Sequence, residues 1–139
     1  MEAFDVGMIN YAKYLIKKGR LFSPYYFNLI IGNIACAQPT LLHVGMMIND
    51  IPERSVISLG GIGNAQLPMN CVAVSMGYGV RIGLEDNIWY DDARTVLATN
   101  KTYLERIHNV IRSTNREMCG PSELRKKLGL KSGYGEYGC

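Results

Sequence analysis

The stretch Gly79-Val-Arg-Ile-Gly-Leu-Glu-Asp86 decides how the chain folds, because its residues alternate between two kinds. One set is apolar and consists of Val80, Ile82 and Leu84. The other set, with polar members, consists of Arg81, Gly83 and Glu85. This period of two predicts a β-strand whose apolar face packs on helices. The face with Arg81 and Glu85 must then point to a polar interior or a ligand, unless the two side chains form an ion pair that merely satisfies the core.

On either side of this strand, apolar segments alternate with segments of helical period. Further strands are predicted at residues 1–7, 25–32 and 55–63, and helices at 9–18, 39–49, 68–76, 97–114 and 121–128. Gly19 and Gly77 are typical of helix ends, and Pro68 suits a first helical position. Strands and helices that alternate through short links predict a parallel sheet covered by helices.

The predicted fold class is therefore α/β, with four strand–helix units. A closed (β/α)8 barrel has eight strands and ~250 residues, whereas this chain has 139 residues. The pattern predicts either half of such a barrel or a small open sheet. An open flavodoxin-like sheet that binds a small ligand at its strand ends is the weaker alternative, because it leaves the run from Arg81 to Asp86 unexplained.

Composition excludes several classes of protein. Fifteen basic and twelve acidic residues give a net charge of +3, which is too small to indicate a nucleic-acid partner. No apolar run reaches the ~18 residues of a membrane span, and no signal peptide is evident, so we expect no membrane partner and a cytoplasmic location. The four cysteines form no CxxC pair and are expected to be reduced thiols. One domain is expected at 1–130, followed by a flexible glycine-rich tail at 131–139.

Several motifs resemble those of the β-keto acid cleavage enzymes, a family that includes the 3-keto-5-aminohexanoate cleavage enzymes of lysine fermentation. The most specific is the run Arg81-Ile-Gly-Leu-Glu85-Asp86-Asn87. Weaker matches are Phe4-Asp5-Val-Gly7-Met8, Gly60-Gly-Ile-Gly63, Gln66-Leu-Pro68-Met69 and Pro121-Ser-Glu-Leu-Arg125. The resemblance covers nearly the whole chain, up to about residue 130.

The resemblance implies an oligomeric TIM barrel that exchanges acetyl-CoA with a β-keto acid, giving acetoacetate and a new CoA thioester. It also implies a divalent metal, normally zinc, held by a His-x-His pair on an early strand and by the motif glutamate, here Glu85. Arg81 and Asp86 correspond to the motif residues of the acid–base and charge-stabilising steps. General chemistry agrees, since zinc polarises a keto oxygen and a neighbouring carboxylate can move a proton.

The resemblance is to the C-terminal half of the family, strands five to eight of the barrel. The chain has no His-x-His, and its two histidines, His43 and His108, lie in predicted helices, which favours structural roles. Glu85 alone cannot hold catalytic zinc tightly. We therefore expect the isolated chain to be inactive and to need the missing N-terminal half, or self-association. A catalytically silent half-barrel that only assembles or binds a ligand is the alternative.

Asp5, Gly60, Gly61 and Gly63 are the predicted substrate contacts. The glycines lie where the third predicted strand runs into a turn and where the backbone could approach a phosphate or thioester closely, although an ordinary tight turn also explains them. Asp5 shares the parity of Ala3 and is expected to face inward, toward a polar substrate tail. A helix-capping role for Asp5 is the alternative, because aspartate is a good N-cap.

Overall fold

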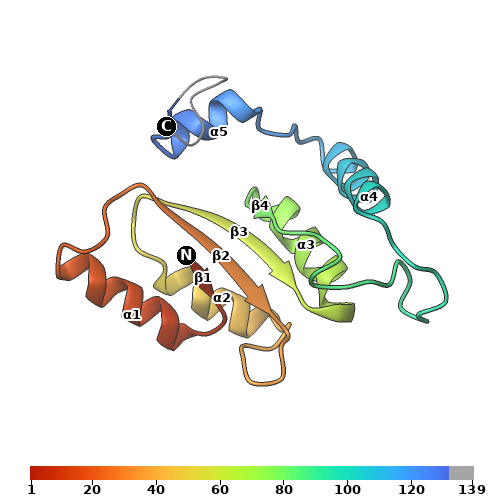
Figure 1. The fold of residues 1–139 in the computed structure, drawn as a ribbon, viewed down its shortest axis with the longest axis horizontal. Helices are drawn as coiled ribbons and strands as arrows, with labels where there is room; N and C mark the ends of the chain where they lie inside the picture. Colours follow the sequence, from red (N-terminus) through yellow and green to blue (C-terminus); the bar gives the residue numbers. More distant parts are fainter. Residues whose placement is uncertain (132–139) are drawn as a thin grey trace.

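The structure is a computed structural model that describes residues 1–131. Its four strands, β1 (Glu2–Ala3), β2 (Tyr25–Ile31), β3 (Ser55–Gly61) and β4 (Gly79–Val80), form one parallel sheet in the order β1-β2-β3-β4. The helices are α1 (Val6–Lys17), α2 (Leu41–Asp50), α3 (Gln66–Met76), α4 (Asn100–Ser113) and α5 (Pro121–Lys127), with a short 3-10 helix η1 (Gly63–Ala65) (Figure 1). The predicted α/β fold with a four-stranded parallel sheet is confirmed. The predicted tail lies outside the described residues after Lys131.

Helix boundaries follow local capping chemistry. Asp5 and Thr40 cap α1 and α2 by accepting hydrogen bonds from backbone amides. Thr99 and Thr102 form a reciprocal capping box at α4, so the predicted start of this helix at Leu97 is early by three residues. Gly77 ends α3 as predicted, with a left-handed φ of 78° that favours glycine. α3 begins two residues before Pro68.

Two strand predictions were too long. The first strand is Glu2–Ala3 instead of residues 1–7, because α1 begins directly after its cap, Asp5. The fourth is Gly79–Val80 instead of 79–86, because the chain leaves the sheet after Val80 and turns at residues 84–86. Both corrections affect the site, since they change where the side chains after each strand point.

The hydrophobic core lies on one face of the sheet. It joins side chains of the strands to those of α1, α2 and α3: Ala3, Ile9, Phe27, Leu29, Met47, Leu59, Met69 and Ala73. Because the strands follow one another in chain order, right-handed connections place their helices on the same side. Figure 1 shows α1 and α2 together along one side of β2 and β3. A flavodoxin-like sheet has a different strand order and helices on both faces, so this arrangement is compatible with part of a TIM barrel.

The opposite face of the sheet carries polar side chains. In the strand register, Glu2 lies beside Asn28, and Asn28 beside Ser58. Tyr26 donates its hydroxyl hydrogen to Ser58 (3.1 Å), and Ser58 in turn bonds to Asn28. This face also carries Arg81. Within residues 1–131, no helix has the length and apolar character to span a bilayer.

Candidate active site

Arg81 is the centre of a cluster of charged side chains where β4 ends. Its Nε lies 3.0 Å from Oδ2 of Asp86, and its Nη2 lies 3.1 Å from Oε2 of Glu85. Its Nη1 lies 2.7 Å from Oε1 of Glu2, on the first strand of the sheet. The guanidinium therefore ties the first strand to the turn that follows the fourth.

The predicted strand could not have built this cluster. Consecutive residues of a strand point to opposite faces, so Glu85 and Asp86 could not both reach one arginine. In the structure the chain turns, and the carbonyl of Gly83 accepts from the amides of Asp86 (3.3 Å) and Asn87 (3.4 Å). The two acidic side chains consequently converge on Arg81. The Arg81–Glu85 ion pair considered above is present, but it is one of three.

Two buried amides of α3 hold this turn in place. Nε2 of Gln66 donates to the carbonyl of Gly83 (3.0 Å), and Nδ2 of Asn70 donates to the carbonyl of Arg81 (2.9 Å). Both residues are almost completely buried. Sequence reasoning missed them as supports of the site, and it missed Glu2 entirely. Their signal was a pair of amides four residues apart in an otherwise apolar helix, a spacing that puts both on one face.

Gly60, near the end of β3, gives the arginine room. A Cβ on Gly60 would lie 3.0 Å from Cβ of Arg81 and 3.1 Å from its carbonyl oxygen. A Cβ on Gly61 would lie 2.5 Å from the carbonyl oxygen of Ala65. Gly63 has a φ of 57° and donates its amide hydrogen to the carbonyl of Asp86 (2.8 Å). The predicted glycines thus lie beside the cluster. Their neighbours in the structure include other residues of the chain, namely Arg81, Ala65 and Asp86.

The three carboxylates differ in how far they reach solvent. The side chain of Asp86 is 5% exposed, whereas that of Glu85 is 83% exposed. The hydrogen bond to Asp86 is the main cause that raises the pKa of Arg81, opposed by burial and helped by the charges of Asp86, Glu2 and Glu85. Arg81 is therefore a fixed cation that orients Asp86, while Glu85 remains open to a ligand.

The segment after Asp86 is held against α4. The buried Tyr103 donates its hydroxyl hydrogen to the carbonyls of Asn87 (3.1 Å) and Trp89 (2.7 Å). The side chain of Asn87 exchanges two further hydrogen bonds with the backbone of Trp89, each 3.0 Å long. Burial raises the pKa of Tyr103, which keeps its hydroxyl a donor. Asn87, the last residue of the motif, is thus held in place by hydrogen bonds to Tyr103 and Trp89.

Other predicted residues lie away from this cluster. Asp5 does not face inward with Ala3 on a strand, because Ala3 is in the core between sheet and helices and Oδ1 of Asp5 accepts from the amide of Met8 (2.9 Å). His43 accepts the amide hydrogen of Gln38 at Nδ1 (2.8 Å), as expected for a structural histidine. Across residues 1–131, no three His, Cys, Asp or Glu side chains are grouped to hold a metal. The described residues do not fit a zinc ion by themselves.

Comparison with known proteins matches this chain to a family. The family model described as beta-keto acid cleavage enzyme matches residues 1–130. The chain is 36% identical over 132 residues to a 3-keto-5-aminohexanoate cleavage enzyme of Fusobacterium nucleatum, covering 94% of the chain and 47% of the relative. It is 32% identical over 129 residues to the enzyme of that name from Acetoanaerobium sticklandii, covering 93% and 47%.

A third relative has a different named substrate. The chain is 35% identical over 131 residues to a 3-dehydrocarnitine:acetyl-CoA trimethylamine transferase of Rhizobium meliloti, covering 94% of the chain and 43% of the relative. The chain thus spans about half the length of the curated relatives it matches. The match over residues 1–130 shows that the chain belongs to the beta-keto acid cleavage enzyme family.

Proposed function

We propose that residues 1–130 form the half of a β-keto acid cleavage enzyme that carries its Arg-Glu-Asp motif, equivalent to strands five to eight of a TIM barrel. The reaction would join the two-carbon unit released from the β-keto acid to the acetyl group of acetyl-CoA. Acetoacetate is formed, and CoA leaves with the remaining acyl group. The names of the relatives support this class, since two cleave a β-keto acid and a third transfers to acetyl-CoA.

The observation that carries the proposal is the Arg81 cluster at the carboxyl end of β4. This end of the strands is where α/β barrels place their reactive groups. Asp86, oriented by Arg81 at 3.0 Å, is the proposed group that accepts and returns the proton of the substrate. Arg81 is the positioning residue for Asp86, because its donors already serve Glu2, Glu85 and Asp86.

The proposed metal role is limited to Glu85. Its exposed carboxylate suits one ligand of a divalent metal such as zinc, but a stable site needs about three protein ligands. The remaining ligands would have to come from outside this chain, as would any His-x-His pair. No step assigned to this chain depends on the metal.

The substrate contacts proposed for this chain are three glycines and one aspartate. Gly60, Gly61 and Gly63 lie beside the cluster and would border the bound acyl group or thioester. A substrate contact at Asp5 stays a prediction, since one of its carboxylate oxygens already caps α1. The cytoplasmic location also stays a prediction.

The test is reconstitution with the part of the Fusobacterium nucleatum relative that this chain does not match. The mixture should form acetoacetate from acetyl-CoA and 3-keto-5-aminohexanoate, while the isolated chain should not. Asp86→Asn should slow turnover by about 100-fold, because it removes the proton acceptor. Glu85→Gln should lower the zinc retained by the assembly, as measured by elemental analysis.

Asp92→Asn is the matched control, because Asp92 is an exposed aspartate near the motif. It should leave turnover unchanged. A well-formed complex that makes no acetoacetate would instead support a silent half-barrel that serves assembly or ligand binding. Full turnover in Asp86→Asn would remove this residue from the chemistry.

A further inference from the structure

A basic pocket lies between α5 and the amino ends of β2 and β3. Its volume is about 400 Å³, within the ~300–1,000 Å³ range of small-molecule sites. Arg54, Lys126 and Lys127 line it, together with the apolar side chains of Pro24 and Val56. No acidic side chain is among its lining residues in the described part of the chain. The pocket therefore concentrates positive charge in a hollow, which raises the local concentration of anions.

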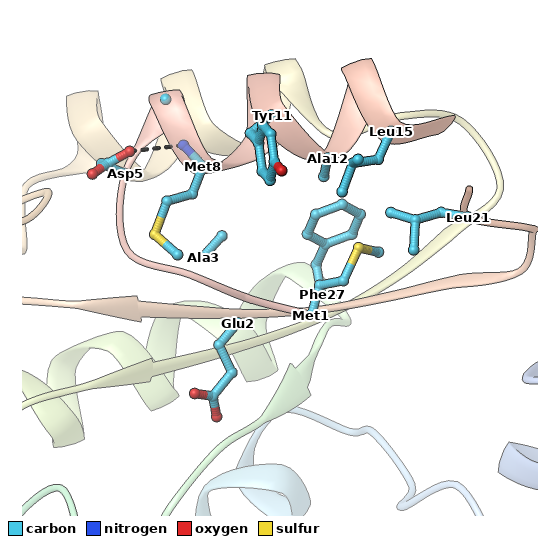
Figure 2. A pocket seen from close by; sticks show the side chains of 11 residues that line it. Met1, Glu2, Ala3, Asp5, Met8, Tyr11, Ala12, Leu15, Leu21 and Phe27 are labelled. Atoms are coloured by element: carbon cyan, nitrogen blue, oxygen red, sulfur yellow. Dashed lines mark hydrogen bonds between the residues drawn. The ribbon is translucent and has the colours of Figure 1, made fainter. Parts of the chain in front are cut away.

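The basic pocket differs from the apolar groove beside β1. That groove has a volume of about 450 Å³ and is lined by side chains such as Met8, Leu15 and Phe27 (Figure 2). Its lining suits apolar groups, whereas a concave cluster of cations attracts a charged ligand. Charge therefore distinguishes the basic pocket as a candidate ligand site.

Arg54 extends from a turn whose backbone is held in place. Its φ of 62° lies in the left-handed region, which is uncommon for a residue with a side chain. The carbonyl of Arg54 accepts the amide hydrogen of Tyr25 (3.2 Å), and the hydroxyl of Ser55 donates to the carbonyl of Pro52 (2.6 Å). Strained backbone of this kind persists where the surrounding structure holds it, and it is typical of functional sites.

The two lysines come from a helix end that is also closed. The amides of Gly129 and Leu130 donate to the carbonyls of Lys126 (3.2 Å) and Arg125 (2.9 Å), which is the Schellman pattern of a helix end. Lysines in a last turn suit the helix dipole, but the dipole does not account for Arg54, which belongs to another part of the chain. The pocket thus brings together cations from two separate elements.

Two of the three cations have no acidic partner. Nζ of Lys127 lies 2.8 Å from Oε1 of Glu123. Within residues 1–131, Arg54 and Lys126 take part in no ion pair. Glu53 precedes Arg54 but is not a lining residue. An anion with several oxygens could therefore bind Arg54 and Lys126 at once.

We propose that the basic pocket binds a small, soluble phosphate monoester, whose phosphate contacts Arg54 and Lys126. A guanidinium matches the geometry of phosphate through two parallel hydrogen bonds, and an ammonium adds a point charge. Pro24 and Val56 offer apolar surface to the carbon part of the ester.

This site is separate from the Arg81 cluster. Ser55 lines the pocket, and Gly60, five residues further along β3, lies against Arg81. Five residues of a strand span about 16 Å. Binding in the basic pocket is therefore independent of the proposed reaction, and it requires no other chain.

Calorimetric titration of the full chain with glycerol 3-phosphate tests the site. We expect saturable binding of one molecule per chain. Inorganic phosphate should bind more weakly, because it has no carbon part to contact Pro24 and Val56. Lys126→Gln and Arg54→Gln should each weaken binding of glycerol 3-phosphate about tenfold, since each removes a hydrogen bond between charged groups.

Lys101→Gln is the matched control. It removes one positive charge from the chain, but this side chain is 84% exposed on α4 and lies outside the pocket. It should bind glycerol 3-phosphate like the unchanged chain. Arg54 and Lys126 are exposed, so all three variants should keep the thermal unfolding midpoint of the unchanged chain when no ligand is present.

Four results would overturn the proposal. The first is no saturable binding of glycerol 3-phosphate or inorganic phosphate. The second is full affinity in both Arg54→Gln and Lys126→Gln, which would place the anion elsewhere. The third is an equal loss in Lys101→Gln, which would mean attraction by net charge alone. The fourth is sedimentation of the chain with vesicles that contain phosphatidic acid, without binding of glycerol 3-phosphate, because the phosphate would then belong to a lipid surface.

Discussion

Nε of Arg81 lies 3.0 Å from Oδ2 of Asp86, and this contact joins the two most buried charges of the site. Asp86 follows Arg81 by five residues, and the intervening turn brings its carboxylate back onto the guanidinium. A buried carboxylate needs such a partner, because burial of an unpaired charge is costly. Arg81 therefore has two roles: it stabilises the turn, and it orients the carboxylate of Asp86.

Replacing the cation should destabilise the protein. Arg81→Met leaves Asp86 buried without its partner, and we expect the free energy of unfolding to fall by about 2–4 kcal/mol. Urea denaturation measures this loss. The double variant with Asp86→Asn should recover part of it, since no unpaired charge then remains. An unchanged denaturation midpoint in Arg81→Met would contradict the prediction that the stability of the protein depends on the Arg81–Asp86 pair.

A methyl group at position 60, against Arg81, should also lower the free energy of unfolding. Gly60→Ala places a Cβ 3.0 Å from Cβ of Arg81, and we expect a loss of about 1–3 kcal/mol from overpacking. Gly45→Ala is the control, because nothing lies within 4 Å of a Cβ at this exposed helical position. It should stabilise the chain by about 0.5–1 kcal/mol. Equal thermal shifts in the two variants would mean that Gly60 does not support Arg81.

The amide of Asn70 should matter more than an ordinary helical asparagine. Asn70→Ala removes the donor to the Arg81 carbonyl and should lower the free energy of unfolding by about 1–3 kcal/mol. The effect is moderated because Oδ1 of Asn70 is itself buried without a hydrogen bond. Asn49→Ala, at an exposed position of α2, should change little. A loss no greater than in this control would argue against the support role.

The loop after Trp89 should respond to acid. The hydroxyl of Thr95 and then the amide of Val96 are the main causes that lower the pKa of Asp91. Because the pKa is lower in the folded state, the stabilisation is present above the ordinary aspartate range and is lost as the pH falls through the folded pKa. The protection of the Thr95 and Val96 amides against hydrogen exchange should therefore be higher at pH 6 than at pH 3.

Asp91→Asn is the variant that isolates this carboxylate. Its protection factors at Thr95 and Val96 should be lower at pH 6 and should depend little on pH. If the unchanged chain shows equal protection at both pH values, Asp91 does not hold the loop.

The predictability of the site differed from residue to residue. Arg81, Glu85 and Asp86 could be singled out because charged residues are unusual in an otherwise apolar strand. Glu2 could not, since a glutamate near a chain start has no signal of its own. Its role depends on a contact between residues 79 positions apart. The turn at Gly83 was also missed, because alternating apolar and polar residues mimic a longer strand.

By itself, the sequence determined the alternation of strands and helices, the parallel sheet and the family, because these follow from local periodicity, capping residues and a specific motif. The tertiary structure alone decided that Glu2 meets Arg81, that Asp5 caps α1, and that an apolar groove lies beside β1. The physical reason is distance along the chain: short-range patterns set the elements, whereas ion pairs and exposed edges depend on how distant elements are packed together.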